Sequence, residues 1–453
     1  MPAAVPGNGF ATEPVQAAAK AQRHLLAPGK NTGTTAACAK RLGIVDATNP
    51  GLFSRAPIAT AGDEGYRAHA LPKAPLWRCR HRDRRIHGPP HPSHSMTLMK
   101  GIQLTSPGQY RLRNDLEVPE PAPKEVRIRV LASGICGTDV HICAGDPSMN
   151  GIIAPPVTLG HEFCGHIDKL GHGVDPKQLA LGDYVSAEMH EVCYECPACR
   201  DGAFHACMSS KIRGISLNGA FAEFVVVSAS NVVKLPAKLP VQVAAILDPL
   251  GNAVHTTMKV PIDGKTVAII GYGPIGAMCG EVASFIGARH IFLIDVADHA
   301  LNRAREWVAR RNISHKVTVL DGRLKPVEAI LGETRGGVDV ALEISGHPVG
   351  INNAIAMTRA AGHVVHLGLP KSDNVTIEKF SKNFIFKGLT LHAVIGREMY
   401  RTWEQMLELI NSGMDISHLI SAELPLEQFG TGIDRFGKGL EQKVVLYPQG
   451  KPR

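Results

Sequence analysis

Four cysteines lie close together in the stretch "HEVCYECPACRDGAFHAC" at 190–207. Cys193, Cys196, Cys199 and Cys207 follow the pattern C-x2-C-x2-C-x7-C. At this spacing, short loops can bring four thiolates around one tetrahedral ion, and zinc is the usual occupant. A closed four-thiolate site leaves no position for substrate or water, so the pattern predicts a structural zinc. The alternative is a set of unrelated buried thiols.

A second candidate metal set combines three types of ligand. "GICGTDVHIC" at 134–143 contains Cys136, and "LGHEFCGH" at 159–166 contains His161 and Glu162. One thiolate, one imidazole and one carboxylate suit a catalytic zinc that keeps an open position. Glycines on both sides of the candidate ligands permit tight backbone paths around such a site. The alternative for the adjacent His and Glu is a pair of surface or turn residues.

Three further polar residues could act beside this second set. Asp248, in "ILDPLGNAVHT", could lie near the metal, or it could be the N-cap of a helix in front of Pro249. Thr138 and His141 follow Cys136 by two and five residues. They could relay a proton from a zinc-bound hydroxyl to water through the ribose of a bound nicotinamide cofactor. Without a neighbouring metal they would be a turn residue and a surface imidazole.

A glycine-rich turn lies between two apolar runs in "TVAIIGYGPIGAMCGEVASFIGARHIFLID" at 266–295. Gly271, Gly273 and Gly276 fit G-x-G-x-x-G, and Asp295 follows at the spacing of a ribose-binding acid. Such a turn brings the backbone and a helix N-terminus to a pyrophosphate. Asp295 would bond the ribose hydroxyls and repel a 2′-phosphate, which favours NAD⁺ over NADP⁺.

The elements around these motifs predict an α/β protein. Apolar runs at 338–345, 362–369 and 389–396 are typical of buried parallel strands, and the segments between them carry helical spacing. We therefore predict a doubly wound domain over 248–397. A β-rich, zinc-bearing domain is predicted at 96–247, with 398–453 returning to complete it.

The net charge of +8 belongs to the N-terminal segment. Residues 1–95 carry 13 Lys and Arg against 5 Asp and Glu, and the rest of the chain carries 36 of each. This segment is rich in Ala, Pro, Gly and His and shows no sustained period, which predicts a disordered extension. The alternatives are a mitochondrial transit segment or a start codon placed too early.

Several classes of protein are disfavoured. The sequence shows neither a secretory signal nor an apolar run long enough to span a membrane, which predicts a cytoplasmic protein with reduced cysteines and no membrane partner. A nucleic-acid-binding zinc ribbon is the alternative class. The zero net charge after residue 95, the 5% of aromatic residues and the lack of a basic stripe beside the cysteines argue against it. Zinc beside a nicotinamide site instead predicts alcohol oxidation or carbonyl reduction.

"GICGTDVH", "GHE", the four-cysteine segment and "GYGPIG" together resemble the zinc-dependent medium-chain alcohol dehydrogenase family, over roughly 99–448. The resemblance implies a GroES-like β-rich catalytic domain and a Rossmann NAD-binding domain. It also implies one catalytic and one structural zinc, NAD⁺ and a homotetramer. "ILDPLGNAVHT" and "GREMYRTW" (396–403) resemble the branch that oxidises L-threonine to 2-amino-3-oxobutanoate. A branch acting on polyols, such as sorbitol or 2,3-butanediol, is the alternative.

The resemblance also implies roles for individual residues. Cys136, His161 and Glu162 match the catalytic zinc ligands, and Asp248 matches an acid near the metal. Thr138 and His141 match the proton relay, and His190 matches a residue that affects substrate choice. Cofactor contacts are implied for Ile275, Asp295, Leu367, Gly368, Leu369, Val394 and Ile395.

Two features leave questions open. Where the family has an arginine five residues after the ribose-binding acid, this chain has Ala300, so NAD⁺ is expected to bind more weakly unless Arg303 or His299 substitutes. Arg397, at the end of a predicted Rossmann strand, could hold the substrate carboxylate or the cofactor. It could equally anchor two domains or subunits.

Overall fold

The computed structural model describes residues 97–372 and 374–451, within the compact unit Pro89–Arg453. The predicted disordered extension lies outside the described residues. Within the described ranges, every helix is too short or too polar to cross a lipid bilayer.

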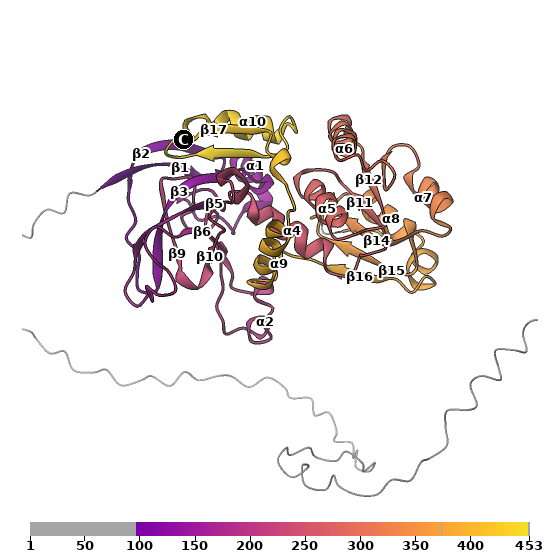
Figure 1. The fold of residues 1–453 in the computed structure, drawn as a ribbon, viewed down its shortest axis with the longest axis horizontal. Coiled ribbons are helices and arrows are strands. Elements are labelled where there is room, and N and C mark those ends of the chain that lie inside the picture. Colours follow the sequence, from indigo (N-terminus) through magenta and orange to yellow (C-terminus); the bar gives the residue numbers. More distant parts are fainter. Residues whose placement is uncertain (1–96, 373, 452–453) are drawn as a thin grey trace, which may run out of the picture. The chain divides into compact units, whose positions relative to one another are not determined.

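The central feature of the second half of the chain is a parallel sheet of six strands (Figure 1). Its strand order is β13-β12-β11-β14-β15-β16, and every neighbouring pair is parallel. This is the order typical of dinucleotide-binding folds, with the direction of winding reversing between β11 and β14. The strands are β11 Thr266–Ile270, β12 His290–Asp295, β13 Val317–Asp321, β14 Val338–Glu343, β15 Thr358–His366 and β16 Thr390–Ala393.

Helices cover both faces of this sheet because successive strand residues point to opposite sides. Val267 and Ile269 of β11 pack into one apolar cluster with α4, α5, α6 and α9. Ala268 and Ile270 pack into another with α7 and α8. The helices are α4 Leu247–Thr257, α5 Pro274–Phe285, α6 Asp298–Arg311, α7 Pro326–Thr334, α8 Pro348–Met357 and α9 Arg401–Asn411.

The first part of the chain is β-rich. A seven-stranded sheet has the order β10-β6-β5-β3-β18-β17, with β9 also paired to β3. Its strands are β3 Glu125–Gly134, β5 Glu162–Leu170, β6 Tyr184–Ala187, β9 Phe224–Ser228, β10 Val232–Lys234, β17 Ala422–Pro425 and β18 Val444–Tyr447. Smaller sheets comprise β1 Leu98–Ser106, β2 Gln109–Glu117 and β4 Val157–Thr158, and β7 His190–Glu191 and β8 Lys211–Ile212. Short helices accompany them: α1 Gly137–Ala144, α2 Pro197–Arg200, α3 Val241–Ala244 and α10 Phe429–Gly437.

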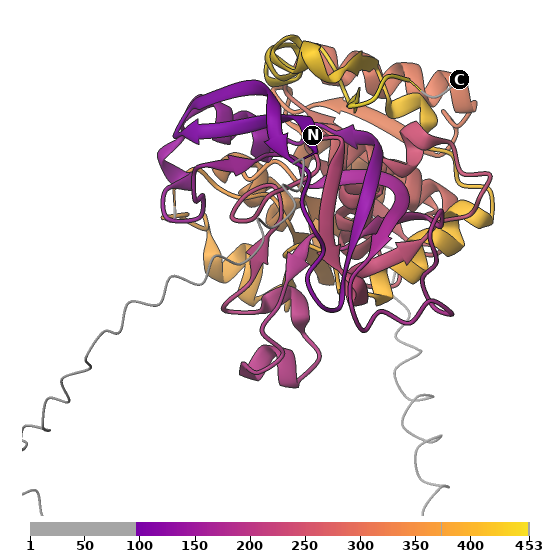
Figure 2. The same ribbon diagram turned by 90° about the vertical axis from the view of Figure 1, so that its left-hand side faces the viewer.

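The C-terminal segment returns to the β-rich part. β18 pairs with β3 in antiparallel register, Val445 opposite Gly134, and the yellow C-terminal elements lie beside the indigo strands in Figure 1. The segment around α2, which carries the four cysteines, projects from this part in the views of Figures 1 and 2. The β-rich sheet thus combines residues from both ends of the described chain.

Candidate active site

The structure brings Cys136, His161 and Glu162 together. Cys136 directly precedes α1, Glu162 begins β5, and the thiol, imidazole and carboxylate ligand atoms all lie within 4.8 Å of one another. His161 and Glu162 are buried, which excludes the alternative of a surface His–Glu pair. The three groups can therefore converge on one ion.

Asp139, in the first turn of α1, lies beside this cluster. Its carboxylate accepts a hydrogen bond from the Cys136 backbone N–H at 2.9 Å, and its second oxygen lies 3.6 Å from His161 Nδ1. Burial lowers the pKa of His161, but Asp139 and Cys136 raise it more strongly, to about 10. Asp248 adds to this effect. Without a metal the cluster thus attracts a proton, and this negative, mixed donor set fits a divalent cation.

Glu162 has a buried cationic partner. Lys443 Nζ, on the residue before β18, lies 2.8 and 2.5 Å from the two Glu162 oxygens and donates to the Ile135 carbonyl at 2.6 Å. Lys443 is 1% exposed and Glu162 is fully buried. The ion pair with Lys443 of the C-terminal segment therefore fixes the position of Glu162, a candidate metal ligand.

Asp248 does not cap a helix, so that alternative is wrong. α4 begins at Leu247 with Ile246 at the cap position, two residues earlier than a helix capped by Asp248 in front of Pro249 would begin. The Asp248 carboxylate instead lies 2.8 Å from Nη2 of Arg397.

Arg397 is a buried anchor, 2% exposed. Its guanidinium donates to both carboxylate oxygens of Glu188 at 2.9 and 2.6 Å, to the Asp248 carbonyl at 3.2 Å and to Asn252 Oδ1 at 3.2 Å. With its donors engaged by the protein, Arg397 has none free for a substrate carboxylate. The structure favours the anchoring alternative.

The predicted relay residues sit on α1. The Thr138 hydroxyl lies 3.7 Å from the Cys136 sulfur. His141, one turn further along, has 58% of its side chain exposed and pairs through Nδ1 with Asp146 at 2.8 Å. The order of these residues leads from the buried cluster to solvent.

The four-cysteine segment forms the second predicted cluster. All four sulfur atoms lie within 4.8 Å of one another, which excludes the alternative of unrelated thiols. The backbone N–H groups of Cys193 and Cys196 point at the sulfurs of Cys207 and Cys193 at 3.4 and 3.3 Å. Hydrogen bonds from the backbone N–H groups of Cys199 and Met208 lower the pKa of Cys196 to about 6. These N–H donors stabilise thiolates, so the segment fits a zinc ion.

Aromatic residues attach this segment to the loop that carries Arg397. The Tyr194 and Tyr400 hydroxyls lie 3.1 Å apart, and the Phe204 ring contacts both aromatic rings edge-on, with centroids 5.6 and 6.1 Å away. Both tyrosines adopt positive φ angles, 58° and 73°, which are uncommon for residues other than glycine. The cysteine segment thus helps to position the loop at 396–400.

The predicted nucleotide-binding residues follow the carboxyl ends of the parallel strands. Gly271 directly follows β11 and has φ +95°. A Cβ on Gly276 would lie 1.9 Å from the Gly271 carbonyl oxygen, so both positions require glycine. A Cβ on Gly273 would meet no heavy atom within 4 Å, and no side chain caps α5 there. The helix N-terminus is open to an anion, which fits a pyrophosphate.

The remaining predicted cofactor residues lie along the same edge of the sheet. Asp295 ends β12, and its carboxylate accepts from the backbone N–H of Tyr272 at 2.6 Å, next to the glycine turn. Leu367, Gly368 and Leu369 follow β15, Val394 and Ile395 follow β16, and Ile275 lies in the first turn of α5.

Ala300, which stands where the family has an arginine, is buried in α6 and is 3% exposed. Arg303 and His299, the two residues that could replace this arginine, are both engaged by other contacts. Arg303 donates to the Gly439 carbonyl at 3.1 Å, and burial lowers its pKa. His299 lies close to Gly439, because a Cβ there would be 2.7 Å from the imidazole. Both side chains thus contact the C-terminal segment.

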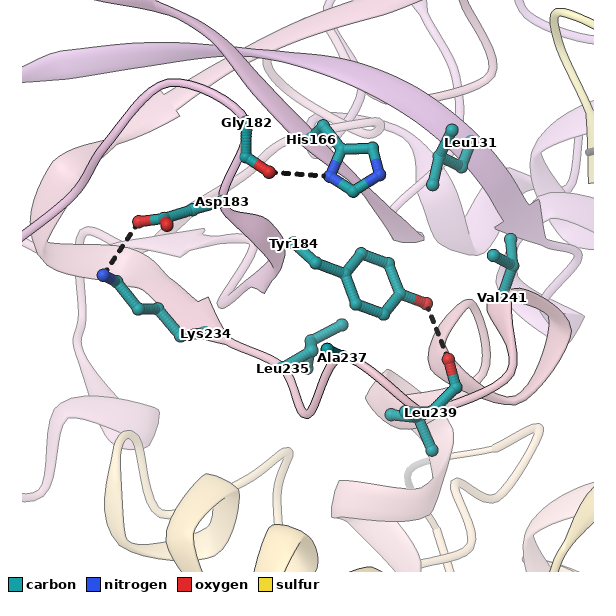
Figure 3. Close-up of a pocket in the computed structure, with 10 residues that line it drawn as sticks. All are labelled: Leu131, His166, Gly182, Asp183, Tyr184, Lys234, Leu235, Ala237, Leu239 and Val241. Carbon is teal, nitrogen blue, oxygen red and sulfur yellow. Dashed lines mark hydrogen bonds and ion pairs between the residues drawn. The ribbon is translucent and has the colours of Figure 1, made fainter.

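A pocket of about 450 Å³ lies elsewhere, in the β-rich part (Figure 3). Tyr184 lies in its middle and donates to the Leu239 carbonyl at 3.3 Å, and Lys234 pairs with Asp183 at 2.8 Å. None of its lining residues belongs to either cysteine-containing cluster or to the glycine turn. This pocket is therefore separate from the candidate active site.

Three buried charged residues were missed by the sequence reasoning: Asp139, Glu188 and Lys443. Asp139 lies inside the quoted "GICGTDVHIC", where an acid between two candidate residues was a usable signal. Glu188 and Lys443 meet partners that lie 209 and 281 residues away along the chain. No local pattern marks such pairs.

The alcohol dehydrogenase GroES-like domain model matches residues 122–237, and the zinc-binding dehydrogenase model matches residues 274–412. The chain is 37% identical over 348 residues to L-threonine 3-dehydrogenase of Photobacterium profundum, a match that covers 77% of this chain and 98% of that protein. A putative zinc-binding dehydrogenase of Sinorhizobium meliloti 1021, solved bound to NADP, has a TM-score of 0.70 and 30% identity, covering 78% of this chain and all of that one. 2R,3R-butanediol dehydrogenase of Bacillus subtilis has a TM-score of 0.69 and 25% identity, with 78% and 100% coverage.

Proposed function

The chain belongs to the zinc-binding alcohol dehydrogenase family, and from this membership we propose that it oxidises L-threonine with NAD⁺ to 2-amino-3-oxobutanoate. The observation that carries the proposal is the 37% identity to an L-threonine 3-dehydrogenase over 98% of that protein's length. The strings at 246–256 and 396–403 support the same substrate. They contain Asp248 and Arg397, which meet in the buried ion-pair cluster.

Cys136, His161 and Glu162 would hold the catalytic zinc, and Cys193, Cys196, Cys199 and Cys207 the structural zinc. Zinc, when bound, polarises a hydroxyl oxygen so that its proton leaves more readily, and NAD⁺, when bound, accepts the hydride from the substrate carbon. Asp139 would orient the His161 imidazole from Nδ1, so that Nε2 serves as the ligand atom. Asp248 places an acid beside the metal cluster.

Thr138 and His141 would carry the released proton to water. The hydroxyl of Thr138 can accept the proton and pass on its own, because it is both donor and acceptor. His141 is the exposed end of the path, and Asp146 holds it in place from Nδ1. The reaction then releases one proton to solvent for each NADH formed.

Gly271, Gly273 and Gly276, with Ile275, would form the turn that receives the pyrophosphate. Asp295 would bind the adenosine ribose hydroxyls, which favours NAD⁺ over NADP⁺ because a 2′-phosphate would meet a carboxylate. The relative of known structure from Sinorhizobium meliloti is bound to NADP, so this preference is a point to measure. Leu367, Gly368, Leu369, Val394 and Ile395 would line the nicotinamide side.

The deciding experiment measures NADH formation, by its absorbance at about 340 nm, with L-threonine, sorbitol and 2,3-butanediol. Each substrate is tested before and after treatment with a chelator, and again after zinc is restored. Activity selective for L-threonine, lost with the chelator and recovered with zinc, is expected. Selective oxidation of a polyol would overturn the substrate and keep the reaction type.

Polyol oxidation is the second candidate, and one observation favours it. The structure of 2R,3R-butanediol dehydrogenase is matched over 100% of its own length by 78% of this chain. Its identity of 25% is lower than the 37% of the threonine enzyme. We therefore place L-threonine first.

We also propose a homotetramer in the cytoplasm. Both proposals follow the family resemblance, and the cytoplasmic assignment follows in addition the eight free thiols of the described residues. Light scattering coupled to size-exclusion chromatography tests the first, since the chain mass is 48.5 kDa. Fractionation of the source cells tests the second.

A further inference from the structure

Tyr400, the residue before α9, has a strained backbone. Its φ and ψ angles are 73° and −56°, a combination that residues other than glycine rarely adopt and that costs free energy. Such a conformation persists only where surrounding contacts impose it. Tyr400 therefore marks a place where other parts of the chain determine the path of residues 396–400.

The Tyr400 hydroxyl lies in a chain of hydrogen bonds with a defined direction. The side-chain amide of Asn231 donates from Nδ2 to the carbonyls of Glu188 and His190, at 3.0 and 2.9 Å. Its Oδ1, which can only accept, lies 3.4 Å from the Tyr400 hydroxyl, so Tyr400 donates this bond. The Tyr400 oxygen then accepts the O–H of Tyr194, 3.1 Å away. The chain thus runs from the cysteine segment through Tyr400 to Asn231.

Asn231 connects this chain to the buried ion pair of Arg397. Arg397 and Trp403, three residues before and three after Tyr400, both donate to the carboxylate of Glu188. Asn231, which is 1% exposed, bonds the backbone of Glu188 and accepts from Tyr400. The loop and the start of α9 are therefore held at three points around one carboxylate, and Tyr400 extends this arrangement to the cysteine segment.

Tyr194, at the other end of the chain, lies between two of the four cysteines. Cys193 and Cys196, on either side of it, are candidate ligands of the structural zinc, and Tyr194 itself has a positive φ of 58°. The Phe204 ring of the same segment packs edge-on against the rings of Tyr194 and Tyr400. The position of the Tyr194 hydroxyl therefore depends on how the four cysteines fold around an ion.

We propose that the cysteine segment holds Tyr400 in its strained conformation, and that Tyr400 is a positioning residue for cofactor binding. With the segment folded, Tyr194 keeps its bond to Tyr400, and the loop at 396–400 keeps its path. Val394 and Ile395, which directly precede this loop, would line the nicotinamide side. The inference rests on the proposed function and couples the structural zinc site to the cofactor site.

Tyr194→Phe tests this coupling, because it removes the hydroxyl that donates to Tyr400 and keeps the ring. Tyr194 is 51% exposed, so the variant should fold. The Michaelis constant for NAD⁺ should rise about 2- to 10-fold, the range for one lost hydrogen bond, with little change in kcat. Tyr110→Phe is the matched control, because the Tyr110 ring packs against Phe429 in the β-rich part. A Michaelis constant within about 1.5-fold of that control would overturn the proposal.

A double-mutant cycle separates this role from two unrelated structural effects. Tyr400→Phe removes the donor to Asn231 and the acceptor of the Tyr194 bond, so it should raise the Michaelis constant for NAD⁺ at least as much as Tyr194→Phe. Because the Tyr194 hydroxyl acts through Tyr400, the double variant should match Tyr400→Phe alone. If the two single effects multiplied instead, the hydroxyls would act independently and the proposal would be wrong.

Hydrogen exchange tests the coupling without reference to catalysis. The Glu404 N–H donates to the Tyr400 carbonyl at 3.0 Å, so a peptide covering 396–411 reports on the loop and on α9. Its exchange should be at least about twofold faster in Tyr194→Phe and in Cys199→Ser, which removes one candidate zinc ligand. The α10 helix should exchange as in the wild-type protein. Unchanged exchange at 396–411, or equal acceleration in α10, would contradict the proposal.

Failure of the proposed function gives a different result. A wild-type enzyme that oxidises a polyol but not L-threonine would change the substrate, and the Michaelis constant for NAD⁺ would then be measured with that polyol. An enzyme without activity with NAD⁺ would overturn the proposed function. The exchange measurement would still decide whether the cysteine segment holds Tyr400.

Discussion

Replacing Lys443 by Met should destabilise the zinc-free protein strongly. The Lys443 ammonium lies within 2.8 Å of both Glu162 oxygens, and both residues are buried. Methionine retains most of the apolar stem but leaves the Glu162 carboxylate buried without a cation, and removing one partner of such a pair costs about 3–5 kcal/mol. With zinc, Glu162 again faces a cation. The decrease in the free energy of unfolding should then be smaller, about 1–3 kcal/mol, which is the cost expected for the unpaired Ile135 carbonyl.

The assay is urea unfolding followed by circular dichroism, first with a chelator and then after zinc is restored. Lys438→Met is the control, because Lys438 makes an exposed pair with Asp434 at 2.8 Å and has 64% of its side chain exposed. The control should change the free energy of unfolding by less than about 0.5 kcal/mol. If the two variants differed by less than about 1 kcal/mol without zinc, the Glu162–Lys443 pair would not have the role assigned to it.

Three further outcomes are expected. Burial raises the pKa of Asp339, but Thr266 and Arg359 lower it to about 2. The ionised carboxylate therefore contributes about 2 kcal/mol to the free energy of unfolding above pH 4, and this contribution is lost as the pH falls towards 2. Thermal unfolding of Asp339→Asn should therefore differ from that of the wild-type protein at pH 6 and converge near pH 2, and a constant difference would contradict this. Asp295→Ala should lower kcat/KM for NAD⁺ by about 10- to 100-fold with little effect on NADP⁺; equal losses would refute the ribose contact. Cys199→Ser should lower the zinc content by about one ion per chain and speed proteolysis within the cysteine segment, whereas unchanged metal content would argue against a structural site.

The sequence predicted most of the fold because the relevant signals are local. The family membership confirms the α/β class with a GroES-like and a Rossmann part. The apolar runs at 266–270, 290–295 and 338–343 became adjacent parallel strands. Gly271 and Gly276 are recognisable because a strand–turn–helix junction imposes steric limits that only glycine meets. The spacing of the cysteines likewise indicates which thiols a short loop can bring together.

The remaining features depend on contacts between distant segments. Glu188 and Arg397 are 209 residues apart, and nothing near either residue indicates that they share a buried ion pair. The choice between substrate-binding and anchoring roles for Arg397 therefore required the structure. Asp248 was ambiguous because Asp before Pro is typical of a helix start, and only the observed start at Leu247 excludes capping. Long-range charge pairing is the part that local patterns do not record.

The position of β18 has a consequence for how the protein is made. This strand, Val444–Tyr447, lies between β3 and β17, and the Ile135 N–H bonds the Val444 carbonyl at 3.0 Å. The six strands of the parallel sheet are contiguous in the chain and are synthesised earlier. That sheet can therefore form while translation continues, whereas the strands around Cys136 and Glu162 await the last residues. A nascent chain that stops at residue 440 should protect β11–β16 from protease and leave β3 and β5 open to cleavage.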